Sequence, residues 1–203
     1  MILAMSRSER LDRLLEVVRE RGYERRKEPF RLSSGGTSYD YVDLRAALSG
    51  GDALGVAADA VIEQAEELGA QFDAIGGMTM GADPVSHAVA LLSGRSWFSV
   101  RKESKSHGTG RRIEGAKVGP GTPVLLFEDT VSTGRSILEA AEVIVDAGAN
   151  IVLAVTLLDR GTDAARSFAE RGLPYKALLT FEDFGIDPLP GPDSAVTAPT
   201  LTR

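Results

Sequence analysis

The residue types best suited to chemistry lie in the stretch VLLFEDTVSTGRSILEAA, residues 124–141. An apolar run that predicts a buried strand ends in two adjacent carboxylates, Glu128 and Asp129. A short hydroxylated loop then opens a predicted helix, and its residues are Thr130, Val131, Ser132, Thr133, Gly134, Arg135 and Ser136. Because a helix N-terminus offers unpaired N–H groups and partial positive charge, this loop can hold a phosphate monoester.

Carboxylates beside a phosphate site indicate a ligand that also carries hydroxyls or a developing positive charge. A 5-phosphoribosyl group meets both conditions, with its phosphate on the loop and its 2- and 3-hydroxyls donating to Glu128 and Asp129. The Walker pattern GxxxxGK[ST] is absent and no GxGxxG follows a predicted strand, which argues against nucleoside triphosphate and dinucleotide sites. The alternative is a solvated acidic turn in which Ser132 or Thr133 only caps the helix.

A second chemistry-bearing segment is strongly basic. Residues 101–117 (RKESKSHGTGRRIEGAK) hold six Lys or Arg against two Glu, in a chain whose net charge is −6. So long a connection inside a domain is typical of a lid, and its cations suit a ligand with several phosphate oxygens. His107 can titrate near neutral pH. The alternative is a solvated, exposed loop.

Alternating strands and helices must position these groups. Strands are predicted at 72–77, 96–100, 123–127, 151–158 and 175–180, and helices near 84–92, 136–148 and 163–172. Uniformly apolar strands that alternate with helices predict an α/β fold with a doubly wound parallel sheet, whose ligand lies at the carboxyl ends of the strands. An amphipathic helix at 8–21, capped by Ser8, a strand pair near 30–42 and a helix at 52–69 precede them.

Length and composition bound the remaining possibilities. The 203 residues predict one domain over 1–187, and the Pro-rich segment 188–203 is expected to be a disordered tail. The acidic balance argues against nucleic-acid and membrane-surface partners. With no cysteine and two histidines, no all-protein metal site is expected, and a cytoplasmic location fits. Trp97 and Phe98 are expected in the core.

The run of four apolar residues followed by Glu-Asp-Thr-x-Ser-Thr-Gly-x-Ser resembles the phosphoribosyl pyrophosphate (PRPP) signature of the type I phosphoribosyltransferases. The basic segment is similar to the catalytic loop of the orotate phosphoribosyltransferases, whose Arg-Lys-x-x-Lys-x-His-Gly pattern is matched by Arg101, Lys102, Lys105, His107 and Gly108. The likeness implies a fold with a small N-terminal hood, contributed by residues 22–50, and a flexible catalytic loop at 101–117.

Further matches extend this resemblance over residues 25–185. GGMTMGADP (76–84) looks like the loop that faces pyrophosphate, and Tyr41 lies where relatives line the base pocket. Asp159-Arg160 is similar to the Asp-Arg pair whose guanidinium holds the orotate carboxylate. Met80 and Ser33 stand where many relatives carry lysine, which removes two cations.

The resemblance implies transfer of the phosphoribosyl group from PRPP to orotate, which gives orotidine 5′-monophosphate and pyrophosphate in pyrimidine biosynthesis. Lys105, His107 and Asp129 would be catalytic, with Arg101, Lys102 and residues 128–136 binding PRPP. Ser132, Arg160 and Tyr41 would position orotate. Mg²⁺ held mainly by PRPP and water is the implied cofactor, and a homodimer that shares its catalytic loops is the implied assembly.

Three other interpretations stay open on the sequence. The first is a purine or other base phosphoribosyltransferase, which the basic loop and Arg160 disfavour. The second is a noncatalytic PRPP-sensing regulator on the same fold, against which Lys105 and His107 argue. The third is a structural α/β protein with coincidental motifs.

Overall fold

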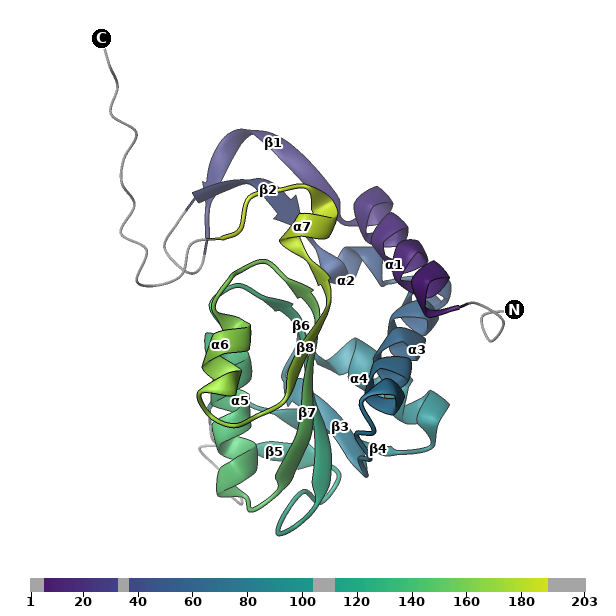
Figure 1. The fold of residues 1–203 in the computed structure, drawn as a ribbon, viewed down its shortest axis with the longest axis vertical. Helices are drawn as coiled ribbons and strands as arrows, with labels where there is room; N and C mark the ends of the chain where they lie inside the picture. Colours follow the sequence, from purple (N-terminus) through teal and green to yellow (C-terminus); the bar gives the residue numbers. More distant parts are fainter. Residues whose placement is uncertain (1–5, 33–36, 104–111, 190–203) are drawn as a thin grey trace.

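The computed structural model describes residues 6–32, 37–103 and 112–189. Figure 1 shows a central sheet with helices on both faces and a small two-stranded sheet at one end. The sheet order is β5-β4-β3-β6-β7-β8. Its strands are β3 (Ala74–Met78), β4 (Ser96–Val100), β5 (Ile113–Gly115), β6 (Pro123–Val131), β7 (Asn150–Asp159) and β8 (Tyr175–Thr180). All neighbours pair in parallel except β4 and β5.

Helices fill both faces because the strands are apolar on both sides. One core lies between the sheet and α1 (Arg7–Arg21), α3 (Gly51–Glu67) and α4 (Asp83–Ser93), and the other lies under α5 (Arg135–Asp146) and α6 (Ala164–Ala169) (Figure 1). Strand order reverses between β3 and β6. The predicted doubly wound α/β fold is confirmed, and its switch point marks the expected ligand crevice.

The N-terminal hood is the antiparallel pair β1 (Tyr23–Arg31) and β2 (Thr37–Val42), followed by the short helix α2 (Leu44–Ala47). It lies beyond the carboxyl ends of β6 and β7 (Figure 1). The predicted strand pair is therefore confirmed, although β1 begins at Tyr23, earlier than expected. Two short helices, α2 and α7 (Phe181–Phe184), were not predicted because a single helical turn has no periodicity to detect.

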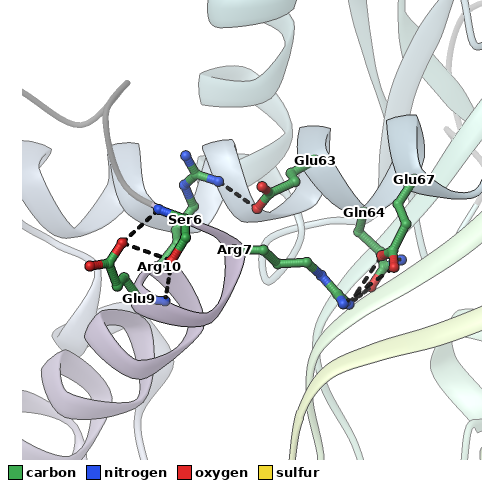
Figure 2. A network of polar contacts seen from close by, with 7 residues as sticks. All are labelled: Ser6, Arg7, Glu9, Arg10, Glu63, Gln64 and Glu67. Atoms are coloured by element: carbon green, nitrogen blue, oxygen red, sulfur yellow. Dashed lines mark hydrogen bonds and ion pairs between the residues drawn. The ribbon is translucent and has the colours of Figure 1, made fainter.

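Helix α1 is tied to α3 by the polar contacts in Figure 2. Arg10 pairs with Glu63 at 2.5 Å, and Arg7 pairs with Glu67 at 3.2 Å. The helix starts at a capping box in which Ser6 and Glu9 exchange hydrogen bonds, so the predicted cap at Ser8 is wrong by two residues. Such a cap stabilises a helix by about 1 kcal/mol.

Four further details differ from the sequence predictions. Strand β6 continues through Glu128, Asp129, Thr130 and Val131, so the acidic pair belongs to the strand and not to a turn. Residues 113–115 of the basic segment form β5 on the sheet edge. Phe98 is core, but Trp97 is exposed.

The fourth difference concerns the C-terminal end. Leu189 is buried and its N–H donates to the Arg160 carbonyl, so the packed part of the chain reaches two residues into the expected tail. Residues 190–203 lie outside the described ranges. No helix in the described part of the chain is long and apolar enough to cross a membrane.

Candidate active site

Two carboxylates from the end of β6 form the centre of the site. Glu128 pairs with Thr156 of β7 in the sheet, so its backbone is fixed on the middle strands. Its side chain is 6 % exposed, and Oε2 has no hydrogen-bond partner among the described residues. Asp129 is half-buried and accepts a hydrogen bond from the Thr130 N–H at 2.7 Å. Glu128 Oε2 is therefore an acceptor without a donor in the described part of the chain.

Burial makes these carboxyls reluctant to ionise. It raises the pKa of Glu128 to about 8, with the charge of Asp129 adding to the rise and the Ser136 hydroxyl opposing it. Burial also raises the pKa of Asp129, whereas the Thr130 N–H and the charge of Arg45 lower it. A ligand that brings hydroxyl donors or positive charge would stabilise the ionised pair, as the ribose diol of the predicted ligand does.

Glu128→Gln is expected to stabilise the protein by an amount that grows with pH. The folded-state pKa of about 8 exceeds the ordinary 4.5. Folded wild type therefore holds a proton that the unfolded chain has lost, and it loses stability as pH rises between these two values. Glutamine does not titrate. Thermal unfolding across this range should show a gain of several degrees in Tm at the alkaline end. The surface variant Glu170→Gln is the control, and a gain that does not vary with pH would contradict the assignment.

The phosphate loop follows directly and comprises residues 132–136. It turns at Gly134, whose φ of +77° is a left-handed conformation that favours glycine, and α5 begins at Arg135. Gly134, the N-cap residue, has no side chain to cap the helix, and the Arg135 N–H makes only a long hydrogen bond of 3.4 Å to Thr133 Oγ1, so the N–H groups at this N-terminus can serve a ligand. Ser132, Thr133, Gly134, Arg135 and Ser136 all line an open cavity of about 950 Å³ together with Thr130, Val131 and Lys102.

The loop after β3 lies beside the acidic pair. A Cβ at Gly81 would be 2.7 Å from Asp129 Oδ1. The loop is held by Asp83, whose carboxylate accepts from Thr79 Oγ1 at 2.6 Å and from Ser99 Oγ at 2.7 Å. Sequence reasoning identified the loop but missed Asp83, which the spacing from Thr79 to the start of α4 could have indicated. Met80 is exposed.

Arg160 reaches the same sheet edge from the end of β7. Its N–H donates to Val131 O at 2.7 Å, and its Nη1 donates to Asp40 O of the hood at 3.1 Å. The side chain is 4 % exposed, and Nε and Nη2 have no hydrogen-bond partner among the described residues. Burial lowers the pKa of Arg160, while the charges of Asp40 and Tyr23 oppose this shift. Two N–H donors of this kind on one edge of a guanidinium have the geometry that suits a bidentate carboxylate.

The hood contacts Arg160 through Asp40, the residue before Tyr41. Asp40 is itself held by the Tyr23 hydroxyl at 2.8 Å and by Arg25 at 3.1 Å. The Tyr41 ring packs edge-on against Phe30, with the Arg26 guanidinium 4.5 Å from its centroid. No sequence signal distinguishes Asp40, because it is the backbone carbonyl that makes the contact with Arg160.

The basic segment is described only at its two ends. Arg101 pairs with Glu114 of β5 at 3.2 Å, and Lys102 faces the cavity of the phosphate loop. Arg112 donates to the carbonyls of Arg101 and Lys102 and pairs with Glu139 of α5 at 2.6 Å. These contacts fix the start of the segment beside α5. Lys105, His107 and Gly108 lie outside the described residues, as does Ser33.

Arg45 of α2 is a cation that the sequence did not single out. Its charge lowers the pKa of Asp129, so a hood guanidinium lies near the acidic pair. Its side chain is exposed, with Nε 4.0 Å from Asp43. Arg45 therefore supplies positive charge near the acidic pair.

Comparisons with known proteins agree with this geometry. No family model matches the chain. An orotate phosphoribosyltransferase from Rhodopirellula baltica is 37 % identical over 168 residues, which cover 78 % of this chain and 86 % of that protein. The enzyme of the same name from Corynebacterium glutamicum is 40 % identical over 158 residues, or 77 % of this chain and 84 % of its own length.

Among solved structures, the Mycobacterium tuberculosis H37Rv orotate phosphoribosyltransferase in complex with PRPP superposes with a TM-score of 0.72. It is 35 % identical, and the match covers 87 % of this chain and 99 % of that one. The sheet order, the hood and the acidic strand end followed by a phosphate loop define a type I phosphoribosyltransferase fold. Within this class, the chain belongs to the orotate phosphoribosyltransferase family.

Proposed function

We propose that this protein transfers the 5-phosphoribosyl group of PRPP to N1 of orotate, giving orotidine 5′-monophosphate and pyrophosphate. The observation that supports this most directly is the contact between two adjacent strand ends. Val131 of β6 accepts a hydrogen bond from the Arg160 N–H at 2.7 Å, so a carboxylate-binding fork lies next to the phosphate loop and the acidic pair. A sugar phosphate and a planar carboxylate can therefore meet at one edge.

PRPP would lie across the carboxyl end of β6. Its 5-phosphate would sit on residues 132–136, where the N-terminus of α5 supplies N–H donors. Its 2- and 3-hydroxyls would donate to Glu128, whose Oε2 has no donor among the described residues, and to the adjacent Asp129. Its pyrophosphate would extend toward the loop after β3, which touches Asp129 at Gly81.

The chemistry separates charge at the anomeric carbon. As the C1–O bond to pyrophosphate breaks, its electron pair leaves with pyrophosphate and the ribose ring becomes oxocarbenium-like. Orotate N1, having lost its acidic proton, then forms the new bond to C1. Glu128 and Asp129 favour the positive ribose, and Arg101, Lys102 and Lys105 offset the charge on pyrophosphate. Lys105 or His107 would donate a proton to the departing group.

Mg²⁺ would bind chiefly to PRPP oxygens and water, in keeping with its preference for phosphates. Within the described ranges, no group of three or more His, Cys, Asp or Glu could hold a metal by itself. The unpartnered Glu128 Oε2 and the adjacent Asp129 are hard oxygen donors that fit an ion shared with the substrate. When bound, the ion would neutralise charge on pyrophosphate.

An orotate depletion assay tests this function. The protein with PRPP and Mg²⁺ is expected to consume orotate, followed by its ultraviolet absorbance, and to release pyrophosphate in equal amount. Turnover with a purine base but not with orotate would contradict the proposal in favour of another base phosphoribosyltransferase. Tight PRPP binding without any turnover would contradict it in favour of a regulator.

We also propose a homodimer, because α4, the adjacent strand β4 and the loop before α4 carry exposed apolar side chains. Leu91 and Leu92 of α4, Trp97 of β4 and Met80 are all exposed. Trp97 is 42 % exposed and packs edge-on against His87, with ring centroids 4.5 Å apart. Strand β4 leads directly into Arg101. A second copy on this face would therefore receive the loop into its own site. The cytoplasmic location stays a prediction of the sequence.

Lys105→Ala is expected to lower turnover at least tenfold, because it removes a cation from the departing pyrophosphate. Steady-state kinetics measures this, with Lys117→Ala as the control at the far end of the segment.

Mixing Lys105→Ala dimers with Asp129→Asn dimers should restore about a quarter of wild-type activity, since half the dimers would be hybrids with one intact site. No recovery on mixing would contradict loop sharing.

A further inference from the structure

We infer that Asp159, which accepts a hydrogen bond from Tyr175, is a positioning residue. It fixes the position of the Arg160 guanidinium that would bind orotate and the position of the phosphate loop. The inference rests on the proposed function, because it assigns these two residues to the same site. It starts from a buried carboxylate that the proposed chemistry does not use. Asp159 is 7 % exposed, and Tyr175 is its one side-chain hydrogen-bond partner among the described residues.

Each oxygen of the Asp159 carboxylate accepts a hydrogen bond, and one of these bonds closes a turn. Oδ1 accepts from the Gly161 N–H at 2.9 Å, which closes a turn around Arg160. Oδ2 accepts from the Tyr175 hydroxyl at 2.9 Å. With both oxygens engaged, the carboxylate cannot rotate, and the backbone of Arg160 between the two bonded residues is fixed.

This turn touches both substrate subsites. On one side, Arg160 donates through its N–H to Val131 O and through Nη1 to Asp40 O, and its free edge is left for a carboxylate. On the other side, Gly161 lies against the phosphate loop so closely that a Cβ would be 1.7 Å from Ser132 O. A shift of the turn would therefore displace the base fork and the phosphate loop at once.

Tyr175 is placed for this role by packing and not by sequence proximity. It pairs with Ala154 at the start of β8, whereas Asp159 pairs with Thr180 at the other end of that strand. Its ring stacks on the fully buried Phe168, with centroids 4.9 Å apart and planes inclined by 16°. Burial raises the pKa of Tyr175, so the phenol keeps its proton and stays a donor.

A stability role alone does not account for this arrangement. Burial raises the pKa of Asp159, and the nearby charge of Asp163 raises it further. A buried carboxylate without a cationic partner contributes less to stability than apolar packing would. Asp159, the last residue of β7, contacts Tyr175, whereas Arg160, which follows the strand, contacts the hood at Asp40 O. Arg160 therefore keeps its charge available for the substrate.

Tyr175→Phe tests the inference, because it removes one hydroxyl and keeps the stacked ring. The expected result is a rise of about tenfold in KM for orotate with kcat lowered less than about threefold. Phe168→Leu is the matched control: it disturbs the same ring and should lower Tm while leaving the orotate KM within about twofold of wild type. Asp159→Ala should raise the KM for orotate more than Tyr175→Phe does. Asp159→Asn keeps an acceptor for the Gly161 N–H and should therefore raise this KM less than Asp159→Ala.

An unchanged orotate KM in Tyr175→Phe would overturn the inference. A rise matched by an equal rise in Phe168→Leu would also overturn it, since loss of packing would then explain both. Arg160→Ala, measured in parallel, separates the two levels of the account. If Arg160→Ala raises the orotate KM and Tyr175→Phe does not, only the positioning role of Asp159 and Tyr175 is contradicted. If neither changes the KM, the assignment of Arg160 in the proposed function fails with it.

Discussion

Replacing Arg160 by alanine should lower kcat/KM for orotate by about two to three orders of magnitude, because a buried charged contact is worth roughly 3–5 kcal/mol when one partner is removed. The guanidinium is 4 % exposed and its Nε and Nη2 have no partner in the described part of the chain. A carboxylate that meets this edge gains two charge-assisted hydrogen bonds in a site from which water is excluded. Steady-state kinetics at saturating PRPP measures the loss.

Two comparisons make this result specific. Uracil is orotate without its carboxylate, so its low kcat/KM should be nearly the same in wild type and in Arg160→Ala. Arg166→Ala is the matched control, because Arg166 is an exposed arginine on α6 that pairs with Asp163 at 2.6 Å. If both pyrimidines lose activity equally in Arg160→Ala, the residue supports the fold of the site and does not bind the carboxylate.

Asp129→Asn should lower kcat by about two to three orders of magnitude, because a preorganised charge at the reacting centre is typically worth 10²–10³ in rate. Asp129 lies between the charge of Arg45 and the loop at Gly81, at the open end of β6. Asparagine keeps the shape and one acceptor but removes the negative charge that stabilises an oxocarbenium-like ribose.

The split between kcat and KM decides how Asp129 acts. Loss of charge stabilisation should appear mainly in kcat, whereas loss of a simple hydroxyl contact should appear mainly in the PRPP KM. Asp146→Asn at the exposed end of α5 is the control. A change confined to KM would limit Asp129 to binding and would transfer the catalytic role to the cationic loop.

The order of the parallel strands and the longer helices could be predicted because these strands are apolar on both faces and these helices have a periodic apolar side. The ends of elements were less predictable. Glu128 to Val131 are polar enough to end a strand, yet their pairing with β7 continues to the register Val131 with Asp159. That ladder depends on a strand 20 or more residues away, which local composition does not reveal. The edge strand β5 could not be predicted for the same reason, because its residues lie in a basic segment and form a strand only by pairing with β4.

The site was predictable where its residues are consecutive and unpredictable where it depends on contacts between distant segments. The run from Glu128 to Ser136 forms one strand end and one helix start, so its chemistry could be inferred from order alone. The Asp40 carbonyl that orients Arg160 lies 120 positions away in sequence. Tyr175 reaches Asp159 from the far end of β8. Neither residue carries a motif, and only the packed fold shows that they support the site.

The most direct test is the crystal structure of the protein with PRPP and Mg²⁺. We expect the 5-phosphate to lie on residues 132–136 at the start of α5, and the ribose 2- and 3-hydroxyls to donate to Glu128 and Asp129. Well-ordered PRPP bound at any other place, with this edge of the sheet left free, would contradict the account.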